Sequence, residues 1–124
     1  MRVVAEKKED STDRLLVIFD ALEEWFREED FYGCLFVTAL GIYPEEDTTI
    51  RHLCQEAKRL TQNYITRLAE KAELQDADEL SEYFMLLIEG AITMTQVNNS
   101  HLSAISDKKA AKVLIKGSTP IKAQ

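Results

Sequence analysis

The sequence predicts an all-α fold of five helices. Only four glycines and two prolines interrupt the 124 residues, and apolar residues recur mostly three or four positions apart, which is the spacing of one helix face. Hydrophobic residues make up 45% of the chain and charged residues 30%, a balance typical of soluble globular proteins. The same spacing leaves no strand candidate, and a chain of this length can bury a core of its own, so no second domain is needed.

The first helix is expected to begin near Ser11 and to end by Glu29, because its apolar residues share one face while charged residues lie largely opposite. Residues 1–10 are rich in charge, and we expect them to form a flexible N-terminal arm. The helical domain would then occupy residues 11–117, and residues 118–124 would form a C-terminal tail.

A short second helix, apolar on all sides, is expected at residues 34–43. Gly33 permits a break before this helix, and Pro44 prevents it from continuing. The apolar run is well short of the ~20 residues that a spanning helix needs. We therefore interpret it as an interior helix and expect no membrane segment.

The third helix is expected to begin around Thr48 and to run to about Leu74, with N-cap oxygens available at its start. Its apolar residues form one arc, so it should cover one side of the core. The fourth helix, at about residues 77–97, differs because apolar residues wrap most of its circumference. A helix buried on two sides needs packing partners on two sides.

The fifth helix, expected at about residues 102–116 after an Asn-Asn-Ser cap, carries too few apolar residues to cover the fourth helix alone. The economical solution is a homodimer in which the last two helices of each copy form a four-helix bundle around a two-fold axis. The predicted interface residues all lie on these two helices: Tyr83, Leu87, Gly90, Ala91, Met94, Leu102, Ile105 and Val113.

The charge balance and the cysteines exclude several classes of function. A net charge of −7 repels phosphate backbones, so we expect no direct nucleic-acid binding by this chain. The lysines near the C-terminus are interpreted as helix-end solvation, with an anionic docking patch as the alternative. Two distant cysteines and no signal-peptide pattern indicate a reduced, cytoplasmic protein.

We expect no catalytic site, no metal and no cofactor. His52 and Cys54 are two positions apart on a helix, so their side chains point in different directions and cannot share a metal ion. The runs of carboxylates lie at helix ends and are interpreted as solvated charge rather than as paired acids. Cys34 and Cys54 are interpreted as buried core residues, and an enzyme is not expected.

A cavity for a small hydrophobic ligand is a hypothesis that the residues leave open. Phe19, Phe36, Tyr64 and Met85 are large side chains that could surround a void between the first four helices, or could simply fill the core. Glu89 interrupts the apolar fourth helix, and it either faces solvent or makes a polar contact inside such a cavity.

Three stretches taken together resemble a known family: LLVIFDALEEWFREEDFYGCLFVTALGIYPEED, IRHLCQEAKRLTQNYITRLAEKAEL and LLIEGAITMTQV. In this order and spacing they resemble the C-terminal regulatory domain of tetracycline-repressor (TetR) family transcription factors, over about residues 14–116. The branch typified by the drug-resistance repressor LmrA has an F-x-G-C turn, an aromatic-proline helix end and a [DE]-G-A triplet. The corresponding residues here are Phe31, Gly33 and Cys34, then Tyr43 and Pro44, then Glu89, Gly90 and Ala91.

This sequence also departs from that branch. Its relatives often have proline after the cysteine, asparagine two residues after the phenylalanine, and an acid before the aromatic-proline pair. Leu35, Thr38 and Ile42 occupy those positions here. Because the acid is missing, the resemblance implies an inducer that is apolar or aromatic.

The resemblance implies an all-helical domain that binds an effector and dimerises, joined in the family to an N-terminal helix-turn-helix domain that binds DNA. We expect that DNA-binding domain to be absent from this chain, because no compact run before Ser11 could supply it. A bound effector would shift the helices and change the spacing of two DNA-binding domains, which releases the operator. The alternative is a dimerisation module that binds no ligand and pairs with an intact relative.

Overall fold

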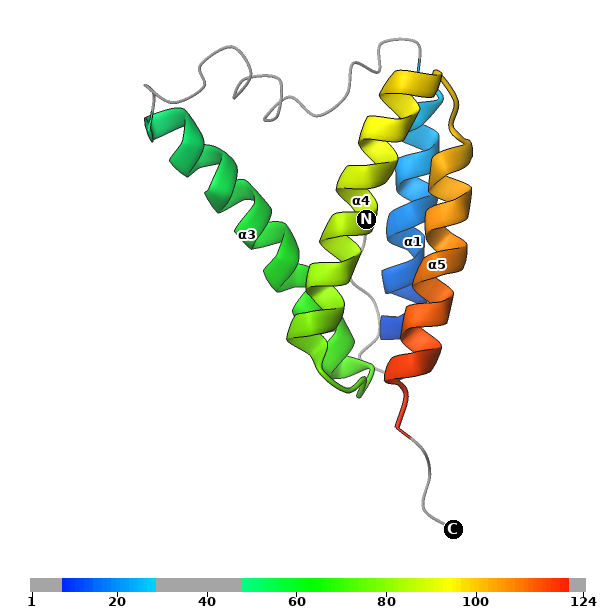
Figure 1. The fold of residues 1–124 in the computed structure, drawn as a ribbon. Coiled ribbons are helices and arrows are strands. Elements are labelled where there is room, and N and C mark those ends of the chain that lie inside the picture. The colour runs from blue at the N-terminus through cyan, green and yellow to red at the C-terminus, as the bar shows by residue number, and fades with distance from the viewer. Residues whose placement is uncertain (1–7, 29–47, 121–124) are drawn as a thin grey trace.

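The computed structural model describes residues 8–28 and 48–120, which form a bundle of α-helices (Figure 1). The helices are α1 (Lys8–Phe26), α3 (Thr48–Lys71), α4 (Ala77–Asn98) and α5 (Leu102–Ser118). No strand occurs in this part of the chain, which confirms the all-α class. The short helix expected at 34–43 lies outside the described residues, as does Phe36.

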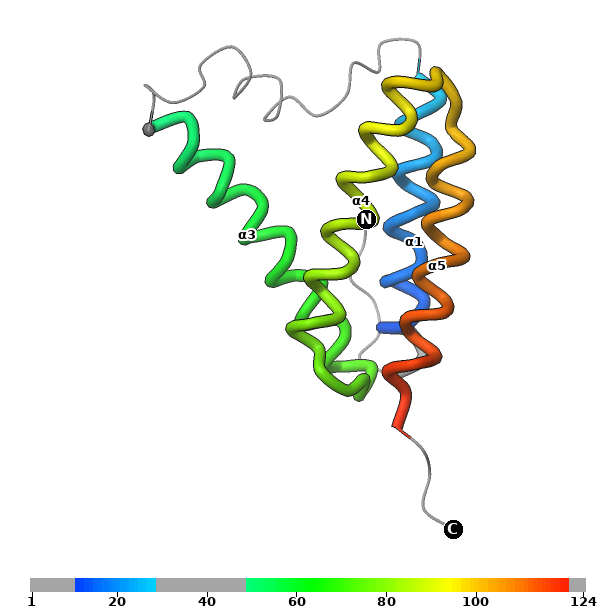
Figure 2. Tube along the Cα trace, in the orientation of Figure 1, coloured from blue at the N-terminus to red at the C-terminus, as the bar shows by residue number. Residues whose placement is uncertain are grey.

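The described helices alternate in direction along the chain. α1 and α4 run one way and α3 and α5 run the other, as the colour gradient in Figure 2 makes visible. α5 packs against both α1 and α4, while α3 packs against α4 and α1. The first half of α3 leans away from the other three helices (Figure 1), so its second half makes most of the packing.

Large side chains from three of the helices fill the core. Leu15 and Phe19 of α1, Ile65 of α3, and Leu80 and Phe84 of α4 are almost completely buried. The rings of Phe19 and Phe84 meet edge to face, with centroids 5.4 Å apart. Such an aromatic pair stabilises the fold by about 1 kcal/mol in addition to the stabilisation from burying its surface. Because both rings are almost completely buried, the contact lies in the core of the bundle.

Two helix boundaries differ from the sequence prediction by up to one turn. α1 begins at Lys8, so three residues of the expected arm are helical. Ser11 is already buried, which gives the first turn of α1 a packing partner. α5 continues to Ser118, inside the expected tail, and the Ser118 carbonyl accepts a hydrogen bond of 2.7 Å from the Gln75 amide.

The Asn-Asn-Ser segment forms the turn between α4 and α5. Asn99 adopts a positive φ of 52°, a conformation that asparagine tolerates better than most residues, and its amide donates to the Thr95 carbonyl. The Ser100 hydroxyl then accepts a hydrogen bond of 3.2 Å from the Leu102 amide at the start of α5. The N-cap of α5 is His101, whose side chain makes no capping hydrogen bond, so Ser100 satisfies the Leu102 amide from the position before the N-cap and differs from the cap that the sequence predicts.

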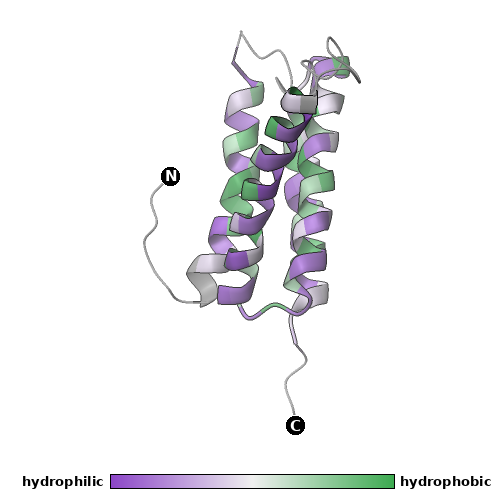
Figure 3. Cartoon of the chain, turned by 90° about the vertical axis from the view of Figure 1, so that its left-hand side faces the viewer, coloured by the Kyte–Doolittle hydropathy of each residue, from purple (hydrophilic) through white to green (hydrophobic). Residues whose placement is uncertain are grey.

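The apolar arc of α3 covers the core less completely than the sequence predicts. Ile65, Leu68 and Ala72 are buried, whereas Leu53 and Leu60 are more than half exposed. The difference follows from the lean of α3, because its second half lies closer to α1 and α4 than its first half does. Figure 3 views the bundle from the α3 side, where hydrophilic and hydrophobic segments alternate along the helices.

Within the described residues, no helix is both long and apolar enough to cross a membrane.

Candidate functional site

An exposed apolar surface runs along α4 and α5, and we call it the α4–α5 face. Its residues on α4 recur at three- and four-residue intervals, so they form one stripe on the side away from Phe84. Leu86, Val97 and Val113 are each more than 70% exposed. The large hydrophobic residues of the face are Tyr83, Leu86, Met94, Val97, Leu102, Ile105 and Val113.

A groove of about 560 Å³ lies between α4 and α5 on this face. Leu87, Gly90, Ala91, Met94 and Leu102, which the sequence analysis assigned to a dimer interface, all line it. A Cβ atom built on Gly90 would meet nothing within 4 Å, so the backbone there is open to close approach. The structure thus brings these five residues together.

The other residues of the predicted interface lie on the same two helices. Tyr83, Ile105 and Val113 are exposed, whereas Ala91 is only 3% exposed and belongs partly to the core of its own bundle. Leu86 and Val97 are highly exposed members of the face that the sequence analysis did not assign to the interface. Their spacing of three and seven residues from Tyr83 and Gly90 was the signal that could have identified them.

A buried acid lies beside the groove. Asp107 of α5 is 9% exposed, and its Oδ2 atom has no hydrogen-bond partner. Burial raises the pKa of this carboxyl from 3.8 to about 7. Ser103 and Ser106 of α5 line the groove with it, as do Asn98 and Ser100, so the groove has polar as well as apolar walls.

The residues proposed from sequence to contact a ligand have different environments. Phe19 packs against Phe84 in the core, and Met85 is partly buried against the same core. Glu89 is partly exposed and accepts a hydrogen bond from the Lys58 ammonium, which joins α4 to the first half of α3. Tyr64 lines a separate pocket, and Phe36 lies outside the described residues.

That separate pocket, of about 240 Å³, lies between α1 and α3, and we call it the α1–α3 pocket. Arg14, Tyr64, Arg67, Leu68 and Lys71 line it. Arg14 is 9% exposed, and its Nη2 atom has no hydrogen-bond partner. The sequence analysis missed this pocket, although the three- and four-residue spacing from Tyr64 to Lys71 places those side chains on one face of α3.

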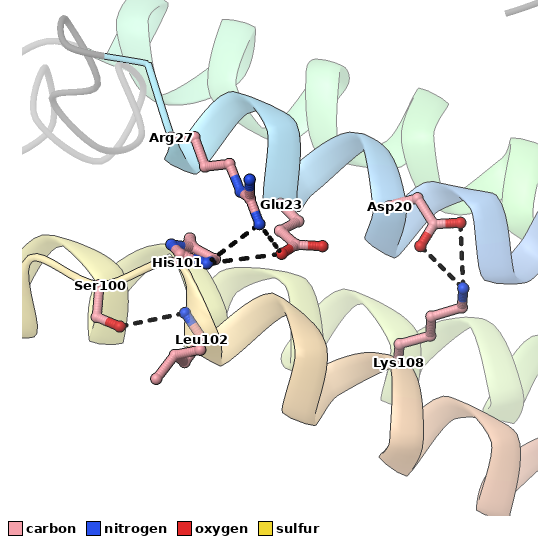
Figure 4. Close-up of polar contacts among 7 residues, drawn as sticks. All are labelled: Asp20, Glu23, Arg27, Ser100, His101, Leu102 and Lys108. Atoms are coloured by element: carbon pink, nitrogen blue, oxygen red, sulfur yellow. Dashed lines mark hydrogen bonds and ion pairs between the residues drawn. The ribbon is translucent and has the colours of Figure 1, made fainter.

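Ion pairs hold α5 and its first residues against α1 (Figure 4). The Lys108 ammonium lies 2.9 and 3.2 Å from the two carboxylate oxygens of Asp20. At the other end of the contact, Glu23 pairs with Arg27 and lies 3.7 Å from the His101 ring. Lys108 is thus one C-terminal lysine with a defined partner rather than a solvated helix end.

Metal ligands are not clustered in the described parts of the chain, where no three His, Cys, Asp or Glu side chains come together. Cys54 is buried, and His52 is exposed on the same helix. Their separation agrees with the sequence argument that they point to different sides of α3.

Comparison with known proteins gives one family and two curated relatives. Residues 12–107 match the family described as the C-terminal domain of LmrA/YxaF-like transcriptional regulators. Over 115 residues, 93% of the chain, the sequence is 22% identical to the "HTH-type transcriptional regulator YjdC" of Escherichia coli (strain K12). The protein of the same name from Shigella flexneri matches to the same extent.

These comparisons confirm the resemblance drawn from the three sequence stretches. The chain spans 60% of the length of each of the two relatives. No solved structure matches the chain.

Proposed function

Because the chain belongs to the family of LmrA/YxaF-like C-terminal domains of transcriptional regulators, we propose that it is the effector-sensing and dimerisation domain of a TetR-like regulator. The family is one of regulators and not an enzyme class. The α4–α5 face is the observation that carries the proposal, because a bundle this small rarely leaves so many large hydrophobic residues exposed along two adjacent helices.

Homodimerisation through the α4–α5 face is the first part of the proposal. The α4 stripe and the open backbone at Gly90 would allow α4 of a second copy to approach closely. In a two-fold dimer the same face serves both copies, so α4 and α5 of each would form a four-helix bundle. The interface would comprise Tyr83, Leu87, Gly90, Ala91, Met94, Leu102, Ile105 and Val113, together with Leu86 and Val97.

Sensing of a small hydrophobic ligand is the second part. We place the ligand among the helices near Phe19, Phe36, Tyr64, Met85 and Glu89, as the sequence analysis did. The arrangement of α3 supports this location, because its first half leans away from α4 and is joined to it by the pair of Lys58 and Glu89. A ligand that favours one position of α3 would shift the population of helix arrangements.

In a longer protein of the kind represented by the two relatives, that shift would act on DNA binding. The relatives are named as helix-turn-helix transcriptional regulators. Two DNA-binding domains held by one dimer must reach two half-sites at a fixed spacing. A change in the angle between the two sensor domains would therefore weaken operator binding.

Sedimentation velocity tests the dimer with a matched pair of variants. Leu86→Glu places a charge on the α4–α5 face, whereas Leu53→Glu places the same charge on α3, at a site of similar exposure. We expect the unmodified chain and Leu53→Glu to sediment as dimers at micromolar concentration and Leu86→Glu as a monomer. Ala91→Arg is a poorer test, because Ala91 is buried within its own bundle.

A thermal-shift screen with planar hydrophobic compounds tests the sensor. A ligand that binds only the folded state raises the melting temperature as its concentration increases. Saturable stabilisation that is lost in Met85→Ala supports the sensor. A dimer that none of the compounds stabilises would favour the alternative, a dimerisation module without a ligand.

A further inference from the structure

We propose that the α1–α3 pocket is an anion site that binds the carboxylate of a small organic acid. The guanidinium groups of Arg14 and Arg67 would hold the carboxylate, and Tyr64 and Leu68 would contact the apolar part of the acid. This site shares Tyr64 with the hydrophobic effector site proposed above, but Arg14 and Arg67 are not part of that site, and the present proposal does not depend on it.

The buried guanidinium of Arg14 is the first observation. A charged group that is buried without a hydrogen-bond partner is costly, and native proteins rarely keep one. The Nη2 atom of Arg14 has no partner, although the residue is nine-tenths buried and lines the pocket. A bound carboxylate would supply the missing acceptor.

The position of Arg14 on α1 argues against a purely structural role for its charge. Basic residues near the end of α3, such as Lys71 in its last turn, complement the negative end of a helix dipole. Arg14 lies instead in the second turn of α1, toward the positive end of that helix, where a cation gains nothing from the dipole.

The charges around the pocket converge from two helices. Arg67 and Lys71 are one turn apart on α3, so both side chains reach the same side of the helix, opposite Arg14 of α1. Arg67 and Lys71 are exposed, and their charges add to that of the buried Arg14 to make the pocket positive, which favours an anion. A guanidinium can also bind a carboxylate through two parallel hydrogen bonds.

The size and the walls of the pocket favour an organic acid over a bare inorganic anion. A volume of about 240 Å³ is several times that of a water molecule, which occupies about 30 Å³ in the liquid. The ring of Tyr64 and the buried side chain of Leu68 add an apolar wall beside the cations. An aromatic or short aliphatic acid would use both parts.

Titration of the 124-residue chain with three probes tests the proposal. Benzoate carries both the ring and the charge, benzamide is its neutral analogue, and inorganic phosphate carries charge alone. We expect benzoate at millimolar concentration to raise the melting temperature and to shift the amide resonances of Tyr64 and Arg67. Benzamide should do neither, phosphate should bind more weakly than benzoate, and added salt should weaken benzoate binding.

Variants on α3 assign the effect to the pocket. Arg59 and Arg67 are both exposed on α3, but Arg67→Gln removes a charge that lines the pocket, whereas Arg59→Gln removes one that does not and that pairs with Glu56. We expect Arg67→Gln to weaken benzoate binding about 10-fold, and Arg59→Gln to leave it unchanged. Arg14→Gln should weaken it at least as much if the variant folds, but the test does not require that variant.

Several results would overturn the proposal. Equal binding of benzoate and benzamide would mean that the charge of the ligand plays no role. Equal losses of benzoate affinity in Arg67→Gln and Arg59→Gln would mean that binding depends only on the overall charge of the protein. Phosphate binding as tightly as benzoate would identify a site for a bare anion. No effect of benzoate at all would show that the pocket does not bind the carboxylate of a small acid.

Discussion

α3 and α4 pack against each other in opposite directions, yet they use their apolar residues in different ways. α3 carries one apolar arc and buries it mainly in its second half, which covers one side of the core. α4 buries Leu80, Phe84 and Ile88 on one side and exposes Leu86, Met94 and other apolar residues on the opposite side. α3 thus has one apolar surface, and α4 has two.

This difference indicates how to interpret apolar residues on a helix. A one-sided arc is explained by the core of the same chain, so it requires no partner. Apolar residues around the whole circumference exceed what one core can cover. Exposed hydrophobic patches of this kind mark interaction sites in soluble proteins, and the second surface of α4 is therefore where a partner is expected.

The largest expected difference is in the free energy of unfolding, between two variants that each truncate one large side chain on a different face of α4. Phe84→Ala removes a buried ring that contacts Phe19, and we expect it to lower the free energy of unfolding by about 3–5 kcal/mol. Leu86→Ala removes a side chain that is 71% exposed, and we expect a change within about 0.5 kcal/mol for the monomer.

Urea-induced unfolding over a range of protein concentrations measures both changes. The small cost of Leu86→Ala should hold at low concentration, where the monomer predominates. At high concentration the cost should grow, because truncation then removes an interface contact as well. A cost that does not depend on concentration would contradict the assignment of this face to a dimer.

Asp107 should make stability depend on pH in an unusual direction. Because burial raises the pKa of this carboxyl from 3.8 to about 7, the folded state binds the proton more tightly than the unfolded state. In that pH window the folded state therefore holds more protons, so stability falls as pH rises from about 4 to 7. Asp107→Asn should remove this loss, and we expect a gain of about 2 kcal/mol at pH 8.

Chemical unfolding at pH 4, 6 and 8 measures the effect, and Asp13→Asn provides a control at an exposed acid of α1. The unmodified chain and Asp107→Asn should have similar stability at pH 4. As the pH rises, Asp107→Asn should become the more stable of the two. Parallel pH profiles for the unmodified chain and Asp107→Asn would mean that the ionised carboxyl finds a hydrogen-bond donor or water in solution. The end of the groove beside Asp107 would then be wetter than an interior surface.

The sequence predicted the parts of the fold that depend on local patterns. Helix periodicity located α3, α4 and α5 to within a few residues, and the excess of apolar residues on α4 indicated a second packing surface. The proposed interface residues on α4 were chosen for the same reason. Leu86 was missed because a helix that is apolar all round does not reveal which residue faces outward until the core is known.

Features that depend on the angle between helices could not be predicted. Leu53 and Leu60 belong to the same arc as Ile65, and only the lean of α3 leaves them exposed. Arg14 and Arg67 are 53 positions apart in the sequence, so no spacing rule brings them to one pocket. Nothing in the local sequence distinguishes Arg14 from an exposed arginine, and its burial depends on how the helices pack.

The pair of Lys58 and Glu89 gives the smallest expected effect and tests the lean of α3. Both side chains are about one-third exposed, and pairs of this kind contribute up to about 1 kcal/mol. A double-mutant cycle with Lys58→Gln and Glu89→Gln should therefore give a coupling below about 1 kcal/mol, similar to the cycle for Asp20 and Lys108. A coupling several times larger would mean that the first half of α3 is firmly held, and it would remove the movement of α3 on which the proposed sensing mechanism relies.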